Sequence, residues 1–286
     1  MQPSFDLRLL ATFIRAAHSG TLSATAIQVG RTQSAVTMQI QRLEEALGGQ
    51  SLFHRSGSGV RLTGSGERFL GYAERILKLH DEAVSVFSGK GLHGSIIFGS
   101  PEDYLIAFFP TLLKSFGAIY PDVEIKVVSA PTVELHPLLR ARQIDLALVS
   151  IPDANVSKDV VRAEPLVWVG SKPTLELHDF GDTVPMALPA SNAMDHRAAC
   201  DAMARTGLRF KISYASNSIA GLIGVARSGL AISVMTQEAV PADLFILKAP
   251  LPSLPQLGIL IAFAEEERSP AIEAFADHIR RVLPSL

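Results

Sequence analysis

The sequence predicts an α/β protein that begins with a small and mostly helical module. Three observations support this prediction. Short helical segments punctuated by glycine fill residues 1–62, a long helix with repeating apolar positions follows over 63–88, and strands alternate with helices from residue 95 onward. A chain of 286 residues has room for two or three domains, because single hydrophobic cores stop growing near this size. Its 48% hydrophobic and 19% charged residues are typical of a globular protein.

Three predicted helices make up most of the amino-terminal module. An apolar-rich helix covers 7–17, and Thr21 can cap a second, short helix that covers 21–29. Gly30-Arg31 makes a tight corner into a third helix over 32–48. A helix, a short helix, a glycine turn and a displayed helix follow one another in a helix-turn-helix.

The third helix has a buried side and an exposed side. Its apolar residues are spaced by four, three and four, which places Val36, Ile40, Leu43 and Leu47 on one stripe. The opposite face carries hydroxyl and amide side chains, which can read base edges in a DNA major groove. A polar face is also what any solvated amphipathic helix shows, so the DNA interpretation depends on the helix-turn-helix around it. The candidate contacts here are Arg31, Thr32, Gln33, Ser34, Thr37, Met38, Gln41 and Arg42.

A small hairpin follows this helix. The apolar segment that begins at Leu52 leads through a glycine-rich turn, 56–59, to a second apolar segment at 60–62, which is the pattern of a wing beside a helix-turn-helix. A Walker phosphate loop is excluded, because it needs Gly-Lys-Ser/Thr opening a helix and this turn opens a strand. Its cations can contact phosphates or enter a minor groove, and they are His54, Arg55 and Arg61. The predicted DNA-binding domain spans residues 1–62.

The long helix over 63–88 is a predicted linker and dimerisation helix. Thr63 can cap it, and apolar residues at 69–70, 73, 76–77, 83–84 and 87 recur with the spacing of a heptad seam. Such a seam favours pairing with a second copy of the chain, although packing within one subunit is the alternative. His80 falls in the seam, either as an ordinary interface residue or as a pH sensor. Residues 89–94 hold three glycines and form the predicted hinge.

The remaining chain alternates strands and helices. This alternation predicts a largely parallel sheet covered by helices. We expect two α/β units with a cleft between them, one made of residues 95–162 together with 264–286 and the other of residues 163–263. The closing helix, 269–283, is expected to return to the first of these units. Ser100-Pro101 is expected to open a helix, with the proline at its first position.

The amino-terminal region resembles the LysR-type transcriptional regulators. The residues that carry the resemblance are 19–26, 32–37, 42–48 and 52–55, and 62–66 resembles that family's exit into its linker helix. The match is dense over residues 5–88 and rests on element order and length beyond them. It implies a winged helix-turn-helix, a long linker helix, and a carboxyl-terminal half like a periplasmic binding protein whose cleft senses a small-molecule effector. The chain departs from a common family pattern at Met38, where many relatives have arginine, and this shifts contacts onto Gln33, Ser34, Thr37 and Arg55.

The loops after the predicted strands are where a ligand is expected. Ligands of open α/β sheets gather beyond the carboxyl ends of the strands, near helix amino termini. Several residues there are equally well explained as N-caps, among them Ser100, Thr132 and Ser216. Glu102 and Asp103 can simply complement a helix dipole; if Glu102 points into the cleft, it disfavours a simple anion and suggests a ligand with hydroxyl or amine donors. The candidate effector contacts are Ser100, Glu102, Ser129, Thr132, Ser150, Asn192 and Asn217.

Composition narrows the partners and the classes of function. Residues 1–70 hold seven Lys or Arg against four Asp or Glu, a charge of +3 within a chain of net charge −2, so DNA binding needs several modest phosphate contacts doubled by dimerisation. The single cysteine, Cys200, excludes an intramolecular disulfide and a CxxC site. No secretory signal or membrane-length apolar run is visible, so we expect a cytoplasmic protein without membrane contact.

These observations favour a transcriptional regulator that binds double-stranded DNA at an interrupted inverted repeat. We expect a homodimer through the linker helix, assembling into a homotetramer, with RNA polymerase as a further candidate partner. The alternatives are an enzyme in the carboxyl-terminal cleft, a solute receptor, or a regulator whose carboxyl-terminal half only oligomerises. The eight scattered histidines form neither HExxH nor metal-ligand spacing, and GxSxG is absent, so we expect no catalytic residues, no metal and no cofactor.

Overall fold

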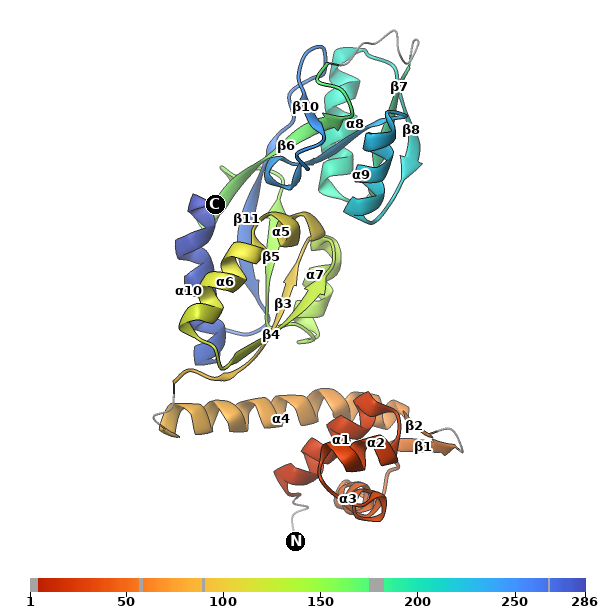
Figure 1. The fold of residues 1–286 in the computed structure, drawn as a ribbon, viewed down its shortest axis with the longest axis vertical. Helices are drawn as coiled ribbons and strands as arrows, with labels where there is room; N and C mark the ends of the chain where they lie inside the picture. The colour runs from red at the N-terminus through yellow and green to blue at the C-terminus, as the bar shows by residue number, and fades with distance from the viewer. Residues whose placement is uncertain (1–4, 57–58, 89–90, 175–182, 267) are drawn as a thin grey trace. The chain divides into compact units, whose positions relative to one another are not determined.

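A computed structural model describes residues 5–56, 59–88, 91–174, 183–266 and 268–286 (Figure 1). The chain consists of two compact units, Met1–Gly94 and Ser95–Leu286. Two residues of the predicted hinge, 89 and 90, lie outside the described residues. In the part of the chain that the structure describes, no helix combines the length and the apolar character needed to cross a bilayer.

The first unit contains the predicted helix-turn-helix and hairpin. Asp6, Thr21 and Thr32 each accept a backbone N–H at the start of a helix, which fixes where the first three helices begin. The core between them is apolar, and Leu10, Phe13, Ile40 and Leu43 are almost completely buried in it. The elements are α1 (Leu7–Ser19), α2 (Leu22–Gln28), α3 (Gln33–Ala46), β1 (Phe53–Ser56) and β2 (Gly59–Leu62).

Helix α4 (Gly64–Ser88) corrects the predicted seam. Thr63 accepts the Gly66 N–H at 3.0 Å, as expected of a cap. Residues 69, 70, 73 and 77 pack into the core of the first unit, so half of the predicted seam packs within its own chain. The predicted seam positions Ile76, Ala83 and Val84 are exposed instead. Ile76 and Ala83 lie on one stripe with the exposed Tyr72 and Leu79, and we call Tyr72, Ile76, Leu79 and Ala83 the α4 stripe. The part of the seam at Phe87 lies outside the described side chains.

The described residues of the second unit form one nine-stranded sheet in the order β4-β3-β5-β11-β6-β9-β7-β8, with β10 paired to β6. The pairs β3–β5, β7–β8 and β7–β9 are parallel, whereas β11 and β6 run antiparallel to their neighbours. The prediction of a largely parallel sheet was therefore wrong in the middle, where these two strands cross between the halves. The strands are β3 (Gly94–Ser100), β4 (Val123–Ser129), β5 (Leu146–Ile151), β6 (Arg162–Gly170), β7 (Val184–Leu188), β8 (Phe210–Ala215), β9 (Ile232–Thr236), β10 (Phe245–Leu247) and β11 (Gln256–Phe263).

Helices cover the sheet and define two lobes (Figure 1). The first lobe contains β3, β4 and β5 with α5 (Glu102–Ala107), α6 (Phe109–Ile119), α7 (Thr132–Arg140) and α10 (Pro270–Val282). The second contains β7, β8, β9 and β10 with α8 (Met194–Thr206), α9 (Ile219–Ser228) and the short 3-10 helix η2 (Gln237–Ala239). Strand β11 pairs with β5 and with β6, so it belongs to both lobes and not to the second lobe alone.

Each lobe has its own apolar centre. The closing helix α10 returns to the first lobe as expected, where Phe275 packs edge-on against Phe98 and Phe116. In the second lobe, Trp168, Met186 and other buried side chains pack under α8. A helix opens after Ser100-Pro101 as expected, but Pro101 is its N-cap and not its first residue. Helix α5 ends after six residues, and the separate helix α6 follows with Pro110 in its first turn.

Candidate functional site

The outer face of α3 is exposed within the first unit. Gln33, Ser34 and Gln41 are exposed, and Met38 keeps 52% of its surface accessible, while Val36 and Ile40 on the opposite side are buried. Thr37 is half-buried, and its hydroxyl donates to the Gln33 carbonyl at 2.9 Å. The side of α3 predicted to read DNA is therefore free of contacts with the core of its own unit.

Local hydrogen bonds order the beginning of this face. The Thr32 hydroxyl accepts the Ala35 N–H at 3.2 Å and lies 3.0 Å from the Ser34 hydroxyl. Ser23 on α2 donates to Oε1 of Gln33 at 3.0 Å. This bond uses the amide oxygen of Gln33, so the two amide N–H groups remain donors for another partner. Sequence reasoning missed Ser23, because its role depends on the packing of α2 against α3.

The predicted cations lie on α3, in the turn before it and on the hairpin. Arg31 and Arg42 are exposed next to and within α3. On the hairpin, His54 lies opposite Arg61 in the antiparallel register, so both belong to one pair of the ladder, and both are exposed. Arg55 is paired with Val60 in β1, but its side chain lies outside the described residues.

The second unit contains a cavity of about 200 Å³ between the two lobes. Glu102, Ser129, Thr132, Ser150 and Asn217 line it, as predicted. The other two candidates are corrections. Ser100 is completely buried at the end of β3, where it donates to the Pro101 carbonyl at 3.2 Å, and Asn192 is exposed outside the lining with its carbonyl bound to Arg197. The lining also includes Asp103, Asp195, Ser216, Ser218 and the apolar residues Leu166, Ile219, Leu222, Val234, Met235 and Leu257.

The hydroxyls of Thr132 and Ser216, which the sequence also allowed as N-caps, make other hydrogen bonds. Pro131 and Ser218 occupy the N-cap positions of α7 and α9, and neither side chain caps its helix. Thr132 instead accepts the Ser150 N–H at 3.0 Å, which joins α7 to β5. Ser216 accepts the Ser218 N–H at 3.2 Å, within the loop that leads into α9.

Glu102 caps a helix of the opposite lobe. Its carboxylate accepts the Ile219 N–H at 2.8 Å and the Ser218 hydroxyl at 3.4 Å, so a residue of α5 satisfies the amino terminus of α9. Of the roles considered from sequence, a helix dipole is indeed complemented, but it is the dipole of α9. No local pattern could have indicated this, because 117 residues separate Glu102 from Ile219.

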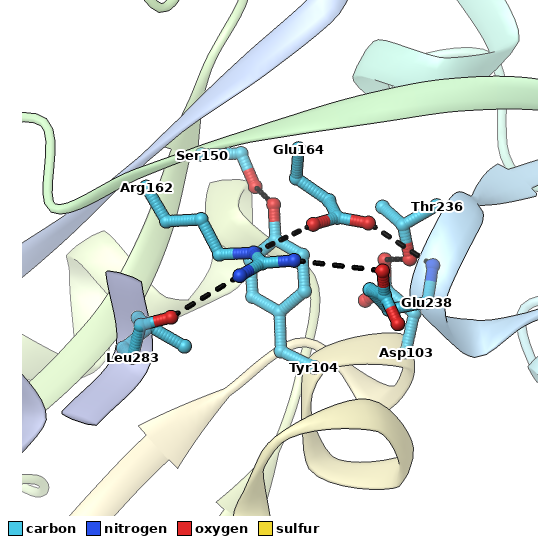
Figure 2. A network of polar contacts seen from close by, with 8 residues as sticks. All are labelled: Asp103, Tyr104, Ser150, Arg162, Glu164, Thr236, Glu238 and Leu283. Atoms are coloured by element: carbon cyan, nitrogen blue, oxygen red, sulfur yellow. Dashed lines mark hydrogen bonds and ion pairs between the residues drawn. The ribbon is translucent and has the colours of Figure 1, made fainter. Parts of the chain in front are cut away.

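Asp103 makes a second contact between the lobes. Thr236, at the end of β9, donates its hydroxyl to Oδ2 of Asp103 at 2.9 Å (Figure 2). Burial raises the pKa of Asp103 from 3.8 to about 7, the Thr236 hydrogen bond opposes this rise, and the charge of Asp195 adds to it. Burial also raises the pKa of Asp195.

A polar network lies next to these contacts (Figure 2). The Arg162 guanidinium on β6 donates to the completely buried Glu164 at 2.8 Å and to the Leu283 carbonyl at 3.2 Å, and it lies 3.6 Å from Glu238. Tyr104 and Ser150 hydrogen bond to each other at 2.8 Å; burial raises the pKa of Tyr104 well above its ordinary value, so its hydroxyl stays neutral. The network connects the crossover strand β6 to the first lobe and to the carboxyl terminus.

The cavity has the chemistry of a binding site. Its charged lining residues are Glu102, Asp103 and Asp195, and among the described residues no lysine, arginine, histidine or cysteine lines it. In the same part of the chain, no group of three His, Cys, Asp or Glu residues could hold a metal ion. Asp195 was missed from sequence, since an acidic residue in the first turn of a helix has no signal beyond dipole complementarity.

Comparisons with known proteins match both units. The family model described as "Bacterial regulatory helix-turn-helix protein, lysR family" matches residues 7–67, and "LysR substrate binding domain" matches residues 89–284. The chain is 47% identical over 285 residues to the HTH-type transcriptional regulator DgdR of Burkholderia cepacia, covering 99% of this chain and 96% of that protein. It is 31% identical over 254 residues to the HTH-type transcriptional regulator PecT of Dickeya dadantii (strain 3937), covering 88% and 79%.

Solved structures share the fold. Full-length CbnR complexed with its target DNA matches with a TM-score of 0.62 at 20% identity, covering 97% of this chain and 99% of that one. A full-length OxyR variant from Pseudomonas aeruginosa matches with a TM-score of 0.63 at 22% identity, covering 97% and 95%.

Proposed function

The chain belongs to the LysR family of DNA-binding transcriptional regulators with an effector-sensing domain, and we propose that it reads its operator with the exposed face of α3. The observation that carries this proposal is that Gln33, Ser34, Met38 and Gln41 are exposed on one side of a helix whose other side is buried. Amides and hydroxyls match the donor and acceptor pattern of base edges, and the apolar Met38 suits a thymine methyl group.

Cations around this face supply affinity. We assign phosphate contacts to Arg31 and Thr32 at the start of α3, to Arg42 within α3, and to His54, Arg55 and Arg61 on the hairpin. The modest excess of positive charge in residues 1–70 makes a single copy a weak binder, so two copies are required for a tight complex.

The α4 stripe is the proposed dimer contact. Tyr72, Ile76, Leu79 and Ala83 are separated by four, three and four residues and are all exposed, which is the spacing of one seam in a coiled coil. Pairing two copies through α4 would present two recognition helices to an interrupted inverted repeat. We propose that a homotetramer forms from two such dimers, acts on chromosomal DNA in the cytoplasm and communicates with RNA polymerase.

The cavity is the proposed effector site. Residues of both lobes line it, so a ligand there can bind one arrangement of the lobes more tightly than another. We propose that it binds its ligand without transforming it, because the described lining offers no nucleophile beside a histidine or lysine base.

Mobility shifts test the DNA-binding proposal. Gln33→Ala is expected to weaken binding to a selected operator by about ten- to a hundredfold while leaving binding to a scrambled duplex unchanged, since a base contact is worth about 1–3 kcal/mol. Arg55→Ala should weaken both complexes alike and reduce the salt dependence by about one phosphate contact. Glu45→Gln, exposed in the last turn of α3, is the control. If Gln33→Ala left the operator complex intact, the assigned reading face would be wrong.

A further inference from the structure

Every ionisable acidic or basic side chain in the described lining of the effector cavity is a carboxyl group. Glu102, Asp103 and Asp195 face the cavity, while no described lysine, arginine or histidine does. Grouped carboxylates in a partly buried site repel one another and any added anion. A ligand whose only charge is a carboxylate would therefore be repelled electrostatically by the lining and bind weakly.

Helix amino termini could have offset this field, because their partial positive charge attracts anions. Helices α8 and α9 begin at the cavity, but the chain's own carboxylates already occupy both ends. The Ile219 N–H of α9 donates to Glu102 at 2.8 Å, and the His196 N–H of α8 donates to Asp195 at 3.0 Å. Helix α7 begins at Thr132 without a side-chain cap, so it can still receive an oxygen atom of a ligand.

Asp195 is the carboxylate best placed to bind a cation. Glu102 is held by α9 and Asp103 by Thr236, whereas among the described residues no side chain donates a hydrogen bond to Asp195. Its Oδ1 accepts the adjacent His196 N–H, which leaves Oδ2 for a ligand. Burial raises the pKa of this carboxyl, and a cation beside it would favour the charged form.

The size and the remaining lining limit the ligand further. A volume of about 200 Å³ lies below the roughly 300–1,000 Å³ of sites for drug-sized molecules, so the ligand is small. Leu166, Leu222 and Met235 add apolar surface to the lining. The ligand should combine one cationic end with a short apolar body.

We propose that the cavity binds a small organic ammonium ion, with Asp195 as its main charged partner and Glu102 and Asp103 completing the acidic wall. This inference rests on the proposed function, because it names the effector class of the same cavity. The ammonium group can belong to a simple amine or to an amino acid, whose carboxylate would then meet the open end of α7.

Isothermal titration of the full-length protein with matched compounds tests this proposal. Each set keeps one carbon skeleton and varies its polar group: valine, isobutylamine, isovalerate and isobutanol form one set, with corresponding sets for alanine, leucine and phenylalanine. The variants are Asp195→Asn, the control Asp201→Asn at an exposed position of the same helix, and Ser129→Trp, which fills the cavity from an exposed position.

We expect at least one amine or amino acid to bind, and its carboxylate-only and alcohol counterparts to bind far more weakly. Asp195→Asn should weaken this binding about tenfold or more, because it removes the charge that pairs with the ammonium group, whereas Asp201→Asn should have no effect. Binding of the amino acid but not the amine, or the reverse, identifies the source of the ammonium group. Equal binding of carboxylates or alcohols, or retention of binding in Asp195→Asn, overturns the proposal. If carboxylates or alcohols bind equally well and Ser129→Trp removes their binding, the cavity is still the effector site but has no preference for an ammonium group. If Ser129→Trp removes the binding of none of the compounds, both the effector site and its ammonium preference are wrong.

Discussion

Substitution of Asp103 by asparagine should make the second unit more stable at pH 8 than the wild type. Burial raises the pKa of Asp103 from 3.8 to about 7 in the folded chain, while the unfolded chain keeps the ordinary value. Because the folded pKa is the higher one, the neutral carboxyl contributes stability that is complete below pH 3.8 and is lost as the pH rises through about 7. Asparagine stays neutral and can still accept the hydrogen bond from Thr236.

The pKa sets the size of the effect. A rise from 3.8 to about 7 corresponds to at most about 4 kcal/mol in the free energy of unfolding above pH 7. Asp103 borders a cavity and is half-buried, so solvent screening reduces this ceiling, and we expect about 1–2 kcal/mol. Near pH 4 the wild type and Asp103→Asn should differ by less than about 1 kcal/mol, because both side chains are then largely neutral.

Trp168 provides the assay. It is the chain's one tryptophan and is buried in β6, so its fluorescence reports unfolding of the second unit. Urea titrations between about pH 4 and about pH 8 give the free energy of unfolding for the wild type, for Asp103→Asn and for the control Asp201→Asn. Identical pH dependence of wild type and Asp103→Asn, or a variant that is less stable at pH 8, would refute the argument that a buried carboxyl lowers stability there.

Three further predictions concern other elements. Arg162→Met leaves the buried Glu164 without its cation and should lower the free energy of unfolding by about 3–5 kcal/mol in the same fluorescence assay; a loss below about 1 kcal/mol would mean that the pair is not effectively buried. Met38→Arg adds a cation to α3, so sequences selected from random duplexes should shift toward guanine; an unchanged selection would place residue 38 outside the groove. Ile76→Asp on the α4 stripe should halve the mass of the proposed assembly in sedimentation equilibrium, whereas Glu67→Gln should leave the mass unchanged; equal masses would locate the α4-paired contact elsewhere.

The sequence predicted the elements whose signals are local. Thr21 and Thr63 cap the helices that follow them, as predicted, and the spacing of Val36, Ile40 and Leu43 identified the buried side of α3. In each case the deciding contacts lie within a few residues of one another. A local pattern was therefore sufficient.

The failures involve contacts between distant residues. Phe69 and Leu70 have heptad spacing, but periodicity only says that one face is buried, and the structure buries it against the first unit's own core. The sequence allowed Thr132 as an N-cap, but its hydroxyl instead accepts a hydrogen bond from the Ser150 N–H of β5. The cavity lining was predicted from the general position of ligands in α/β sheets, which located Ser129 and Asn217 but could not indicate Asp195.

The same distant contacts suggest how a ligand could bias the arrangement of the lobes. Both carboxylates of α5 bind the second lobe, Glu102 through the amino terminus of α9 and Asp103 through Thr236. A cation bound beside them competes with the Ile219 N–H and the Thr236 hydroxyl for carboxylate oxygens, and it stabilises the charged form of Asp103. Its affinity must then differ between arrangements in which these inter-lobe bonds are formed and those in which they are loosened. Unequal affinity of this kind is the one thermodynamic requirement for a ligand to shift a conformational equilibrium.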